Sequence, residues 1–458
     1  MMTQATDKQI KFHMVTIESL VPEKHLLRKV ERLVDFSFIY REVEDCYCRN
    51  NGRPSIDPVV IIKYLLIGFL YGIESERRIE QEIQVNMAYR WFLGLDIDEP
   101  VPDHSTISYN RKKRFAGKEL LRKLFERVVR VCISQGLVTG KLILTDSTHV
   151  KANTSRQSEQ VVEVEYRPAE YLSVLDTYEQ KERKRLEEAG RIPPPKCHRR
   201  QKGTPKTVSK RISKTDSDAG FYKRKGKPEG MHYLSHQSID AAKGIIVDVH
   251  TTPGNVTDAT PYVNRLIKIR EKLGLAVSEA GADSGYDIGL VHQQLVEAGI
   301  LFYTPINHEK PQYKSAFRRE DFSYQEECDC FICPAGKCLS LKRLQRCEYG
   351  VYREYQAKKE DCQSCLYRSE CLTGSFPNRR LSVNLFEPAV KQNHAMDGSE
   401  RHREVLRLRQ IWCEGSFAAQ KHRHNLRRLL RRGLEAATEH CLLSTTALNI
   451  KRMVNCLA

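Results

Sequence analysis

The chain has 458 residues, of which 40% are hydrophobic and 29% charged, and its formal net charge is +17. This length excludes one compact core and favours two to four domains, with the composition of a soluble globular protein. The positive charge points to an anionic partner. It is concentrated in residues 196–230, with 12 Lys/Arg against 3 acids, and in residues 401–458, with 12 against 4. Either run could also be a solvated loop or tail.

The N-terminus contains no apolar core long enough for a signal peptide. The apolar run from Val59 to Leu70 includes Lys63 and is shorter than the roughly 20 residues of a membrane span. We expect a core helix there, with Asp57 as N-cap and Pro58 in the first helical position, and no membrane association. A cytoplasmic location follows, in which the 15 cysteines would be thiols or metal ligands and not disulfides.

Residues 1–137 are predicted to be entirely helical. Asp103 can cap a helix through HSTISYNRKKRF, and an amphipathic helix is expected over residues 118–135. A helix, a turn and a basic helix make a plausible DNA reader, with Arg111, Lys112 and Lys113 as its contacts. The alternative is a helical packing domain whose basic cluster is merely exposed.

Three acidic residues follow features that could bring them together. Asp146 comes directly after a short buried strand in LILTDSTHVKANTS (residues 142–155), and we expect it at the tip of that strand. Asp283 lies in a Gly-rich turn before an amphipathic helix, and Glu414 shares one side of a helix with Phe417 and Lys421. Such carboxylates suit a pair of hard divalent cations. Alternatively, they are a strand-end cap, a turn residue and a surface helix residue.

The segments around these acids predict an α/β sheet. Residues 156–190 have helical spacing, and RIPPPKCHRRQKGTPK after them predicts a mobile basic loop. Two strands are expected from His232 onward, joined around residues 242–244, and Asp258 can cap the next helix. A helix and the strand LFYTPI follow Asp283.

The chain between Asp283 and Glu414 is too long for a direct return, so we expect an inserted subdomain. Eight of the 15 cysteines lie within 44 positions there, between Cys328 and Cys371. The pairs Cys330/Cys333 and Cys362/Cys365 have the C-x-x-C spacing that lets two thiolates meet at one tetrahedral zinc. An iron–sulfur cluster would use the same ligands, and free buried thiols are the other alternative.

Basic residues follow Glu414 at helical spacing. They predict a basic helix that faces DNA phosphates, before a last apolar helix over LLSTTALNIKRMV that covers the sheet. The residues of this predicted basic helix are Lys421, Arg423, Arg427, Arg428, Arg431 and Arg432.

Several segments together resemble the bacterial insertion-sequence DDE transposases over most of the chain. They are SIDPVVIIKYLLIGFLYG, PDHSTISYNRKKRF, TDSTHVKANTS, KTDSDAGFYKRKG through DVHTTPGNVTDATPYVNRL, GADSGYD and EGSFAAQK. The resemblance implies an α/β fold: a ribonuclease H-like mixed sheet flanked by helices, an all-helical N-terminal domain and a Cys-rich inserted subdomain. The expected domains are residues 1–137, the first part of the core at 138–310 with a basic insertion at 156–230, the Cys-rich insertion at 311–380, and the rest of the core at 381–458.

The resemblance also implies the site. The catalytic triad would be Asp146, Asp283 and Glu414, holding two Mg²⁺ or Mn²⁺ ions, and Lys421 would be the family's basic residue after the glutamate. The family's aromatic and arginine before the glutamate have no equivalent in register, since Gln410 and Ile411 precede Trp412, with Arg407 and Arg409 nearby. The implied zinc ligands are Cys333, Cys362, Cys365 and Cys371.

The implied activity is two-metal-ion cleavage of DNA at the ends of an insertion sequence, followed by attack of the freed 3′-OH on target DNA. The partners would be the terminal inverted repeats and the target DNA, bound by a homodimer associated with the nucleoid, because transposition joins two ends. The alternatives are a non-catalytic, domesticated DNA-binding protein and a nuclease of the same fold that cuts without strand transfer.

Overall fold

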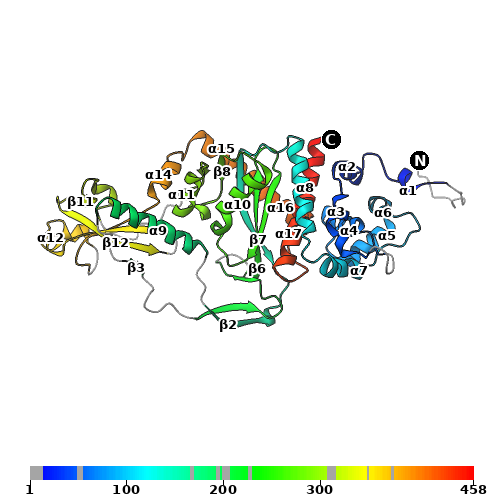
Figure 1. The fold of residues 1–458 in the computed structure, drawn as a ribbon, viewed down its shortest axis with the longest axis horizontal. Helices are drawn as coiled ribbons and strands as arrows, with labels where there is room; N and C mark the ends of the chain where they lie inside the picture. Colours follow the sequence, from blue (N-terminus) through cyan, green and yellow to red (C-terminus); the bar gives the residue numbers. More distant parts are fainter. Residues whose placement is uncertain are drawn as a thin grey trace, which may run out of the picture.

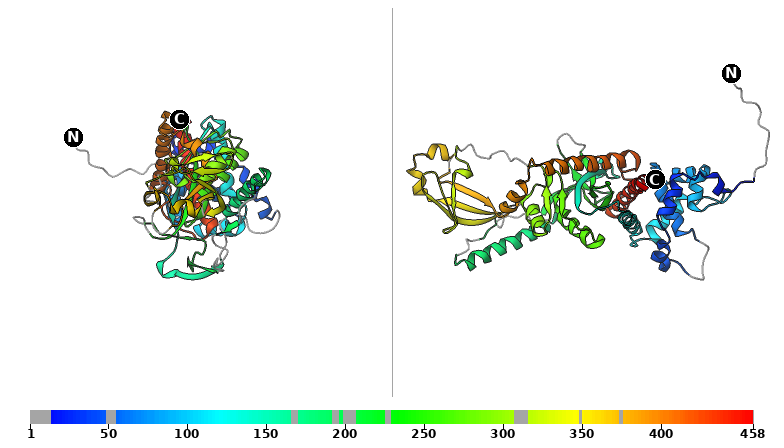
Figure 2. Two further views of the ribbon diagram at one scale, coloured as in Figure 1. Left: turned by 90° about the vertical axis from the view of Figure 1, so that its left-hand side faces the viewer. Right: turned by 90° about the horizontal axis from the view of Figure 1, so that it is seen from above.

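The computed structural model describes residues 14–48, 55–165, 170–191, 196–198, 207–224, 229–306, 316–347, 350–372 and 376–457. The molecule is elongated, with a helical domain at one end, a sheet covered by helices in the middle and a second sheet at the other end (Figure 1). The view from above gives the same order along the long axis (Figure 2). The sheet that holds Asp146 is therefore the central body of the molecule.

The described residues before position 138 form helices and no strands, which confirms the predicted helical N-terminal domain. Asp57 caps α4 as predicted, since its side chain accepts a bond of 2.7 Å from the amide of Val59, and α4 is buried along most of its length. The helices are α1 (Ile17–Leu20), α2 (Leu26–Leu33), α3 (Phe38–Val43), η1 (Glu44–Cys46), α4 (Pro58–Tyr71), α5 (Glu76–Val85), α6 (Met87–Leu93), α7 (His104–Tyr109), the π-helical turn η2 (Asn110–Arg114) and α8 (Leu120–Ser134).

No single helix in the described part of the chain is long and apolar enough to cross a membrane. The helices α4 and α5 reach that length and hydrophobicity only as a pair, and the two are bent by 94° to each other.

The central sheet is mixed. Strand β6 pairs antiparallel with β1, β5 and β7, whereas β8 and β9 continue the sheet on the other side of β1 in the parallel sense. The order β7, β6, β1, β8, β9, with only β6 reversed, is that of a ribonuclease H-like sheet and confirms the predicted fold class. The strands are β1 (Leu142–Lys151), β5 (Gly220–Tyr222), β6 (Gly230–Asp240), β7 (Ile246–Pro253), β8 (Glu279–Gly281) and β9 (Leu301–Tyr303).

Helices cover both faces of this sheet. Successive residues of a strand point to opposite faces, and on β1 Asp146 contacts the last residue of α15 whereas Ser147 contacts the start of α10. The face to which Asp146 points is covered by α15 (Glu400–Arg409), α16 (Gly415–Arg423) and α17 (Leu434–Leu457). The helices α10 (Ala259–Leu273) and α11 (Gly289–Glu297) follow β7 and β8. Ile143 and Leu144 of β1 are fully buried between these helices and the sheet, as the apolar run in the sequence predicted.

A second sheet interrupts the chain between Asp283 and Glu414, which confirms the predicted insertion. It consists of β10 (Ser323–Gln325), β11 (Cys330–Ile332), β12 (Cys338–Cys347), β13 (Gly350–Ala357) and β14 (Arg380–Asn384), with the short helices α12 (Lys359–Gln363) and α13 (Arg368–Cys371). Helix α14 (Glu387–His394) then leads the chain back toward α15 and the central sheet (Figure 1).

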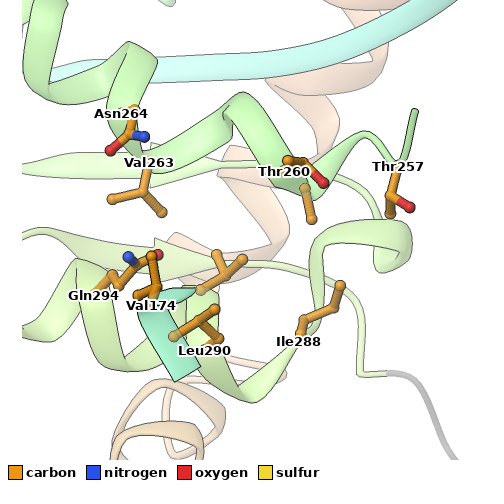
Figure 3. A pocket seen from close by; sticks show the side chains of 10 residues that line it. Val174, Thr257, Thr260, Val263, Asn264, Ile288, Leu290 and Gln294 are labelled. Carbon is orange, nitrogen blue, oxygen red and sulfur yellow. The ribbon is translucent and has the colours of Figure 1, made fainter. Parts of the chain in front are cut away.

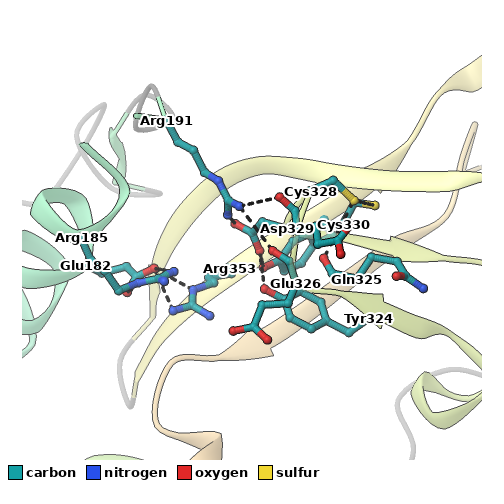
Figure 4. A network of polar contacts seen from close by, with 12 residues as sticks. Glu182, Arg185, Arg191, Tyr324, Gln325, Glu326, Cys328, Asp329, Cys330 and Arg353 are labelled. Atoms are coloured by element: carbon teal, nitrogen blue, oxygen red, sulfur yellow. Dashed lines mark hydrogen bonds and ion pairs between the residues drawn. The ribbon is translucent and has the colours of Figure 1, made fainter. Parts of the chain in front are cut away.

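The Cys-rich sheet recruits a segment from much earlier in the chain. Strand β3 (Lys196–His198) pairs in parallel with β12, and helix α9 (Glu170–Glu188) lies along the same sheet. A polar network joins them (Figure 4): Glu182 of α9 forms an ion pair of 2.8 Å with Arg353 of β13, and Arg191 forms one of 3.1 Å with Asp329. The sequence predicted the helix of this segment but not its association with the insertion.

Residues 159–165 are a strand, so the helical prediction is wrong at the start of segment 156–190. Strand β2 (Glu159–Glu165) pairs antiparallel with β4 (Thr207–Ser213) in a two-stranded ribbon below the core (Figure 1). Three valines in seven residues favour an extended chain, and the distant partner that completes the ribbon is not visible in the local pattern. The predicted basic loop lies largely outside the described residues.

The prediction of a basic helix after Glu414 is also wrong for the residues beyond Arg423, because α16 ends there. Residues 424–433 form turns, and Asn425 has a φ of +60°. The Asn425 amide donates to the carbonyls of Gly68 (3.2 Å) and Ile73 (3.0 Å), and the His424 ring bonds the carbonyl of Phe69 at 2.7 Å. The carbonyl of Gly68 also accepts the backbone amides of Gly72 and Ile73. The side chains of His424 and Asn425 therefore dock residues 424–433 on the end of α4, and the chain does not continue as a helix there. The predicted apolar helix follows as α17.

Gly244 ends the turn between β6 and β7, and its close packing against Trp412 can be tested by substitution. Its φ is +70°, and a Cβ there would lie 2.2 Å from Cε3 of Trp412. We expect Gly244→Ala to lower the free energy of unfolding by about 1–3 kcal/mol, because the methyl adds both backbone strain and a clash. Urea denaturation measures this loss. Gly274→Ala is the control, since Gly274 has a φ of +66° but no described atom within 4 Å of the added Cβ. Equal losses in the two variants would contradict the close packing at Trp412.

Candidate active site

Asp146 lies where β1 loses one of its two neighbours. The parallel pairing of β1 with β8 ends at Leu144 and Gly281, whereas the antiparallel pairing with β6 continues to Lys151. The sequence analysis expected Asp146 at the tip of its strand, and this expectation is wrong. Strand β1 continues for five residues beyond Asp146, because it remains paired with β6. The side chain is 16% exposed and lies on the face of the sheet where it contacts Arg409, the last residue of α15.

Asp283 follows β8 by two residues and begins the short turn η4 (Ser284–Tyr286). Its Oδ1 accepts a hydrogen bond of 2.9 Å from the amide of Gly285, and its carbonyl accepts one of 2.8 Å from the Thr304 hydroxyl. The turn precedes α11, as the sequence predicted. Asp283 is thus fixed at the end of the strand next to β1.

Glu414 is the last residue of a π-helical turn, η6 (Gln410–Glu414), between α15 and α16. Such turns contain one residue more than an α-helical turn and occur often at functional sites. The residues beside Glu414 are held firmly. Cys413 is buried, and the guanidinium of Arg452 from α17 lies 5.4 Å from the Trp412 ring and 2.9 Å from the Ser416 hydroxyl. Glu414 itself is 56% exposed and lies at the open side of the site.

Arg409 joins two of the three acids. Its Nη1 donates to Oδ2 of Asp146 at 2.8 Å, and its Nη2 is 3.6 Å from Oε1 of Glu414. Arg409 stands five residues before Glu414, and the π-helical turn between them changes the helical register. This geometry distinguishes Arg409 from Arg407, the other arginine that the sequence offered.

A pair of buried glutamines fixes α16 against the sheet. Gln237 is the β6 residue opposite Asp146, and its amide exchanges hydrogen bonds of 3.0 and 2.8 Å with Gln420 of α16. Both side chains are fully buried. Because buried amides are costly when unpaired, this reciprocal pair fixes the distance and register between the Asp146 strand and the Glu414 helix.

The site concentrates negative charge. Burial, opposed by the guanidinium of Arg409 and assisted by the nearby Asp283 and Asp258, raises the pKa of Asp146 to about 6. The Asp283 carboxylate is thus near enough to interact with Asp146. A single arginine does not offset these charges, and a bound cation would.

Asp258 is the acidic residue whose role the sequence did not reveal. It precedes α10 as predicted, but its side chain makes no capping hydrogen bond, so the predicted cap is wrong. Instead its Oδ1 accepts a hydrogen bond of 2.7 Å from the hydroxyl of Ser147, the residue after Asp146. A local pattern cannot show this contact, since the partners are 111 positions apart.

The basic residues chosen as DNA contacts fall into two groups. Arg111 is 9% exposed and forms an ion pair with Glu76, so its guanidinium is not presented to a ligand, and the prediction of a DNA contact does not fit. Arg431 likewise binds Glu439. Lys421 is half-buried at the end of α16. The exposed members are Lys112, Lys113, Arg423, Arg427, Arg428 and Arg432, and Arg432 also donates to the carbonyl of Asn153.

A pocket lies beside Asp258 between α10, α11 and the start of α9 (Figure 3). It is lined by apolar and uncharged polar side chains, among them Thr260 and Val263 of α10 and Leu290 of α11. Because none of its lining residues is charged, this pocket does not offer the ligands that a divalent cation needs.

The four cysteines expected to bind zinc line one cavity of the insertion. These residues are Cys333, Cys362, Cys365 and Cys371. The Cys333 sulfur accepts a hydrogen bond of 3.4 Å from the amide of Lys337. Cys330 belongs to a different group, since its sulfur is 2.7 Å from that of Cys328. Four thiols are the donor types that a tetrahedral zinc takes, but the four sulfurs are not among the groups of ligand atoms that lie within 4.8 Å of one another in the described residues.

Among the described residues, a further group of metal-ligand type is formed by Asp287, His292 and His394. Oδ1 of Asp287 lies 2.8 Å from Nε2 of His292 and 2.9 Å from Nε2 of His394. Hydrogen bonds account for both distances, so this group is a polar link between α11 and α14.

Two family models match the chain. The Transposase domain (DUF772) matches residues 15–113, and the Transposase DDE domain matches residues 332–454. A solved structure, that of the piggyBac transposase synaptic complex with hairpin DNA, is similar with a TM-score of 0.37 and 8% sequence identity, over 93% of this chain and 73% of that chain. No curated protein matches the chain in sequence.

The first matched domain corresponds to the helical domain, and the second extends from the Cys-rich sheet through Glu414 and Lys421 to the last helix. Between them lies the ribonuclease H-like sheet that holds Asp146 and Asp283. The chain thus matches a transposase domain and a transposase DDE domain, each over a part of its length.

Proposed function

We propose that Asp146, Asp283 and Glu414 bind two Mg²⁺ or Mn²⁺ ions, and that the enzyme cuts and transfers the DNA ends of an insertion sequence. The observation that supports this most is the shared guanidinium of Arg409, which brings Asp146 within reach of Glu414 although 268 positions separate them in the sequence. Asp283 adds a third charge on the neighbouring strand. The oxygen donors and their excess negative charge fit the coordination that these ions prefer.

When bound, the two ions would supply an activated nucleophilic oxygen and neutralise the charge that grows on the leaving oxygen. The protein's own residues contribute position and charge. Asp146 is fixed by the sheet and Asp283 by its turn, whereas Glu414 is exposed enough to adjust to the DNA. Arg409 offsets part of the negative charge before a cation enters.

Exposed basic residues around the site would bind DNA phosphates. Arg423, Arg427 and Arg428 follow Glu414 on one connected segment, and Lys421 is two helical turns beyond it. Such contacts would make DNA affinity fall steeply with salt. We propose that Lys112 and Lys113 add contacts from the helical domain, and that two copies of the chain bind the two element ends in the cytoplasm.

We also propose that the four clustered cysteines bind one structural zinc. These cysteines belong to the segment of β11 and α12, which lies at the end of the molecule opposite the helical domain (Figures 1 and 2). The role we assign to this zinc is to hold α12 and α13 against the Cys-rich sheet.

The decisive test of the activity is Asp146→Asn. With Mg²⁺ and DNA carrying the element ends, we expect the wild-type protein to give nicked and strand-transfer products and the variant to give background levels, while its affinity for the DNA changes less than about threefold, since a single carboxylate makes no phosphate contact. The exposed Asp98→Asn is the control and should keep full activity. A wild-type protein that binds the ends but leaves them intact with both metals would contradict the proposal, and cleavage without joining would point to a nuclease.

The raised pKa of Asp146 predicts a pH-dependent stability in EDTA. This carboxyl titrates near pH 6 in the folded protein and near pH 4 in an unfolded chain. The folded state therefore binds the proton more tightly, and stability present below about pH 4 is lost as the pH rises through about 6, by up to about 3 kcal/mol. We expect the wild-type Tm to fall between about pH 4 and 7 more than that of Asp146→Asn, and Mg²⁺ to restore it. Parallel pH curves for the two proteins would contradict the assignment.

The zinc assignment predicts that Cys365→Ser loses its metal. We expect about one zinc per chain in the wild-type protein and much less in the variant, together with a lower Tm, since structural zinc contributes directly to folding. Elemental analysis of purified protein measures this. Cys328→Ser is the matched control from the same insertion and should retain the zinc. Iron with visible absorbance would indicate a cluster instead, and metal-free wild-type protein would exclude both.

A further inference from the structure

Asp258 has the position of a helix cap but not the function of one. A capping side chain bonds the amide of the second or third residue of its helix. In α10 the third residue is Pro261, which has no amide hydrogen, and the amide of Thr260 already donates to the carbonyl of Thr257 at 3.0 Å. Neither position therefore offers a free amide to the Asp258 carboxylate, which makes no capping hydrogen bond to α10.

The carboxylate turns toward two adjacent strands of the central sheet. Its Oδ1 accepts the 2.7 Å bond from Ser147 and lies 3.9 Å from Nδ1 of His236. Ser147 of β1 and His236 of β6 are opposite each other in the strand register. His236 is 4% exposed, and its Nδ1 has no hydrogen-bond partner although Nε2 is 2.9 Å from the Thr252 hydroxyl. A buried, unpartnered ring nitrogen aimed at Asp258 indicates that this carboxylate is its intended acceptor.

Ser147 directly follows Asp146, and their side chains point to opposite faces of β1. Just before these residues the strand loses its pairing with β8, so β6 is the only strand among the described residues that pairs with it there. The bond from Ser147 to Asp258 supplies a second support from the face opposite the site. A carboxylate that must hold a cation needs such support, because residues behind metal ligands fix the direction of the ligands.

We propose that Asp258 is a positioning residue of the transposase site: through the Ser147 hydroxyl it holds the part of β1 that presents Asp146 to the divalent cations. This inference rests on the proposed function of Asp146 as a metal ligand. Asp258 contacts Ser147 and faces His236, and it acts on the reaction through them. Loss of partners of this kind typically weakens metal affinity or activity by about 10–100-fold.

The test combines Ser147→Ala, Asp258→Ala and the double variant. In each we measure the Mn²⁺ affinity of the protein without DNA and the Mg²⁺ concentration for half-maximal cleavage of element-end DNA. Each single variant should weaken both by about tenfold or more. The double variant should be no worse than the more affected single one, because both substitutions remove the same bond. Asp258→Asn keeps an acceptor for the hydroxyl and should restore most of the loss.

Asp57→Ala is the matched control, because Asp57 is an aspartate that does cap its helix. It should lower the Tm, since loss of a cap costs about 0.5–2 kcal/mol, and leave both metal measurements unchanged. Asp258→Ala should show the opposite pattern. A lower Tm with unchanged Mn²⁺ affinity and Mg²⁺ dependence would overturn the proposal and make Asp258 a structural residue.

The two readouts separate this inference from the proposed function. If Ser147→Ala and Asp258→Ala weaken Mn²⁺ binding while the wild-type protein fails to cut DNA, the positioning role stands and the proposed activity fails. If the wild-type protein cuts DNA, Asp146→Asn does not, and Asp258→Ala matches the wild-type protein in both metal measurements, the proposed function stands and the positioning role fails.

Discussion

The structure has to hold acidic side chains from distant parts of the chain near one another. Burying Asp146 beside Asp283 and Asp258 disfavours its ionised form, and the raised pKa of Asp146 reflects that cost. The rest of the fold offsets this cost through fixed supports. Arg409 supplies the one positive charge in contact with Asp146 among the described residues, and the paired amides of Gln237 and Gln420 attach the Glu414 helix to the Asp146 strand. In our proposal, a bound cation supplies the positive charge that Arg409 alone does not provide.

This constraint accounts for the architecture around the site. Asp146 and Asp283 come from adjacent strands of the central sheet, and Glu414 comes from a helix that returns after the Cys-rich insertion. The insertion forms its own sheet, and α9 is bound to it through the Glu182–Arg353 and Arg191–Asp329 ion pairs. It therefore lengthens the molecule without separating the acids. Asn425 and His424 join the helical domain to the core. Their side chains form hydrogen bonds with the backbone carbonyls of Gly68, Phe69 and Ile73, at and just after the end of α4.

Much of this could be predicted where the signal is local. Asp57 and Pro58 mark the start of α4, the apolar run before Asp146 marks a buried strand, and the choice of Cys333 over Cys330 agrees with the cavity that the four cysteines line. The resemblance to DDE transposases implied a ribonuclease H-like mixed sheet flanked by helices, and the observed fold class confirms it.

The errors occur where a distant contact overrides a local preference. Arg111 looks like a surface base but is neutralised by Glu76, and residues 424–433 have helical spacing but leave the helix to dock on α4. Asp258 has a capping sequence, yet Pro261 removes a capping donor and Ser147, from another strand, supplies the contact. The π-helical turn before Glu414 shifts the register, so spacing alone could not select Arg409.

The central claim is that the three carboxylates form one cation site. Anomalous diffraction from crystals grown with Mn²⁺ and DNA carrying the element ends tests it most directly. The account predicts manganese peaks in contact with the carboxylates of Asp146, Asp283 and Glu414. Peaks elsewhere, or a Glu414 that stays remote from Asp146 with DNA bound, would contradict it.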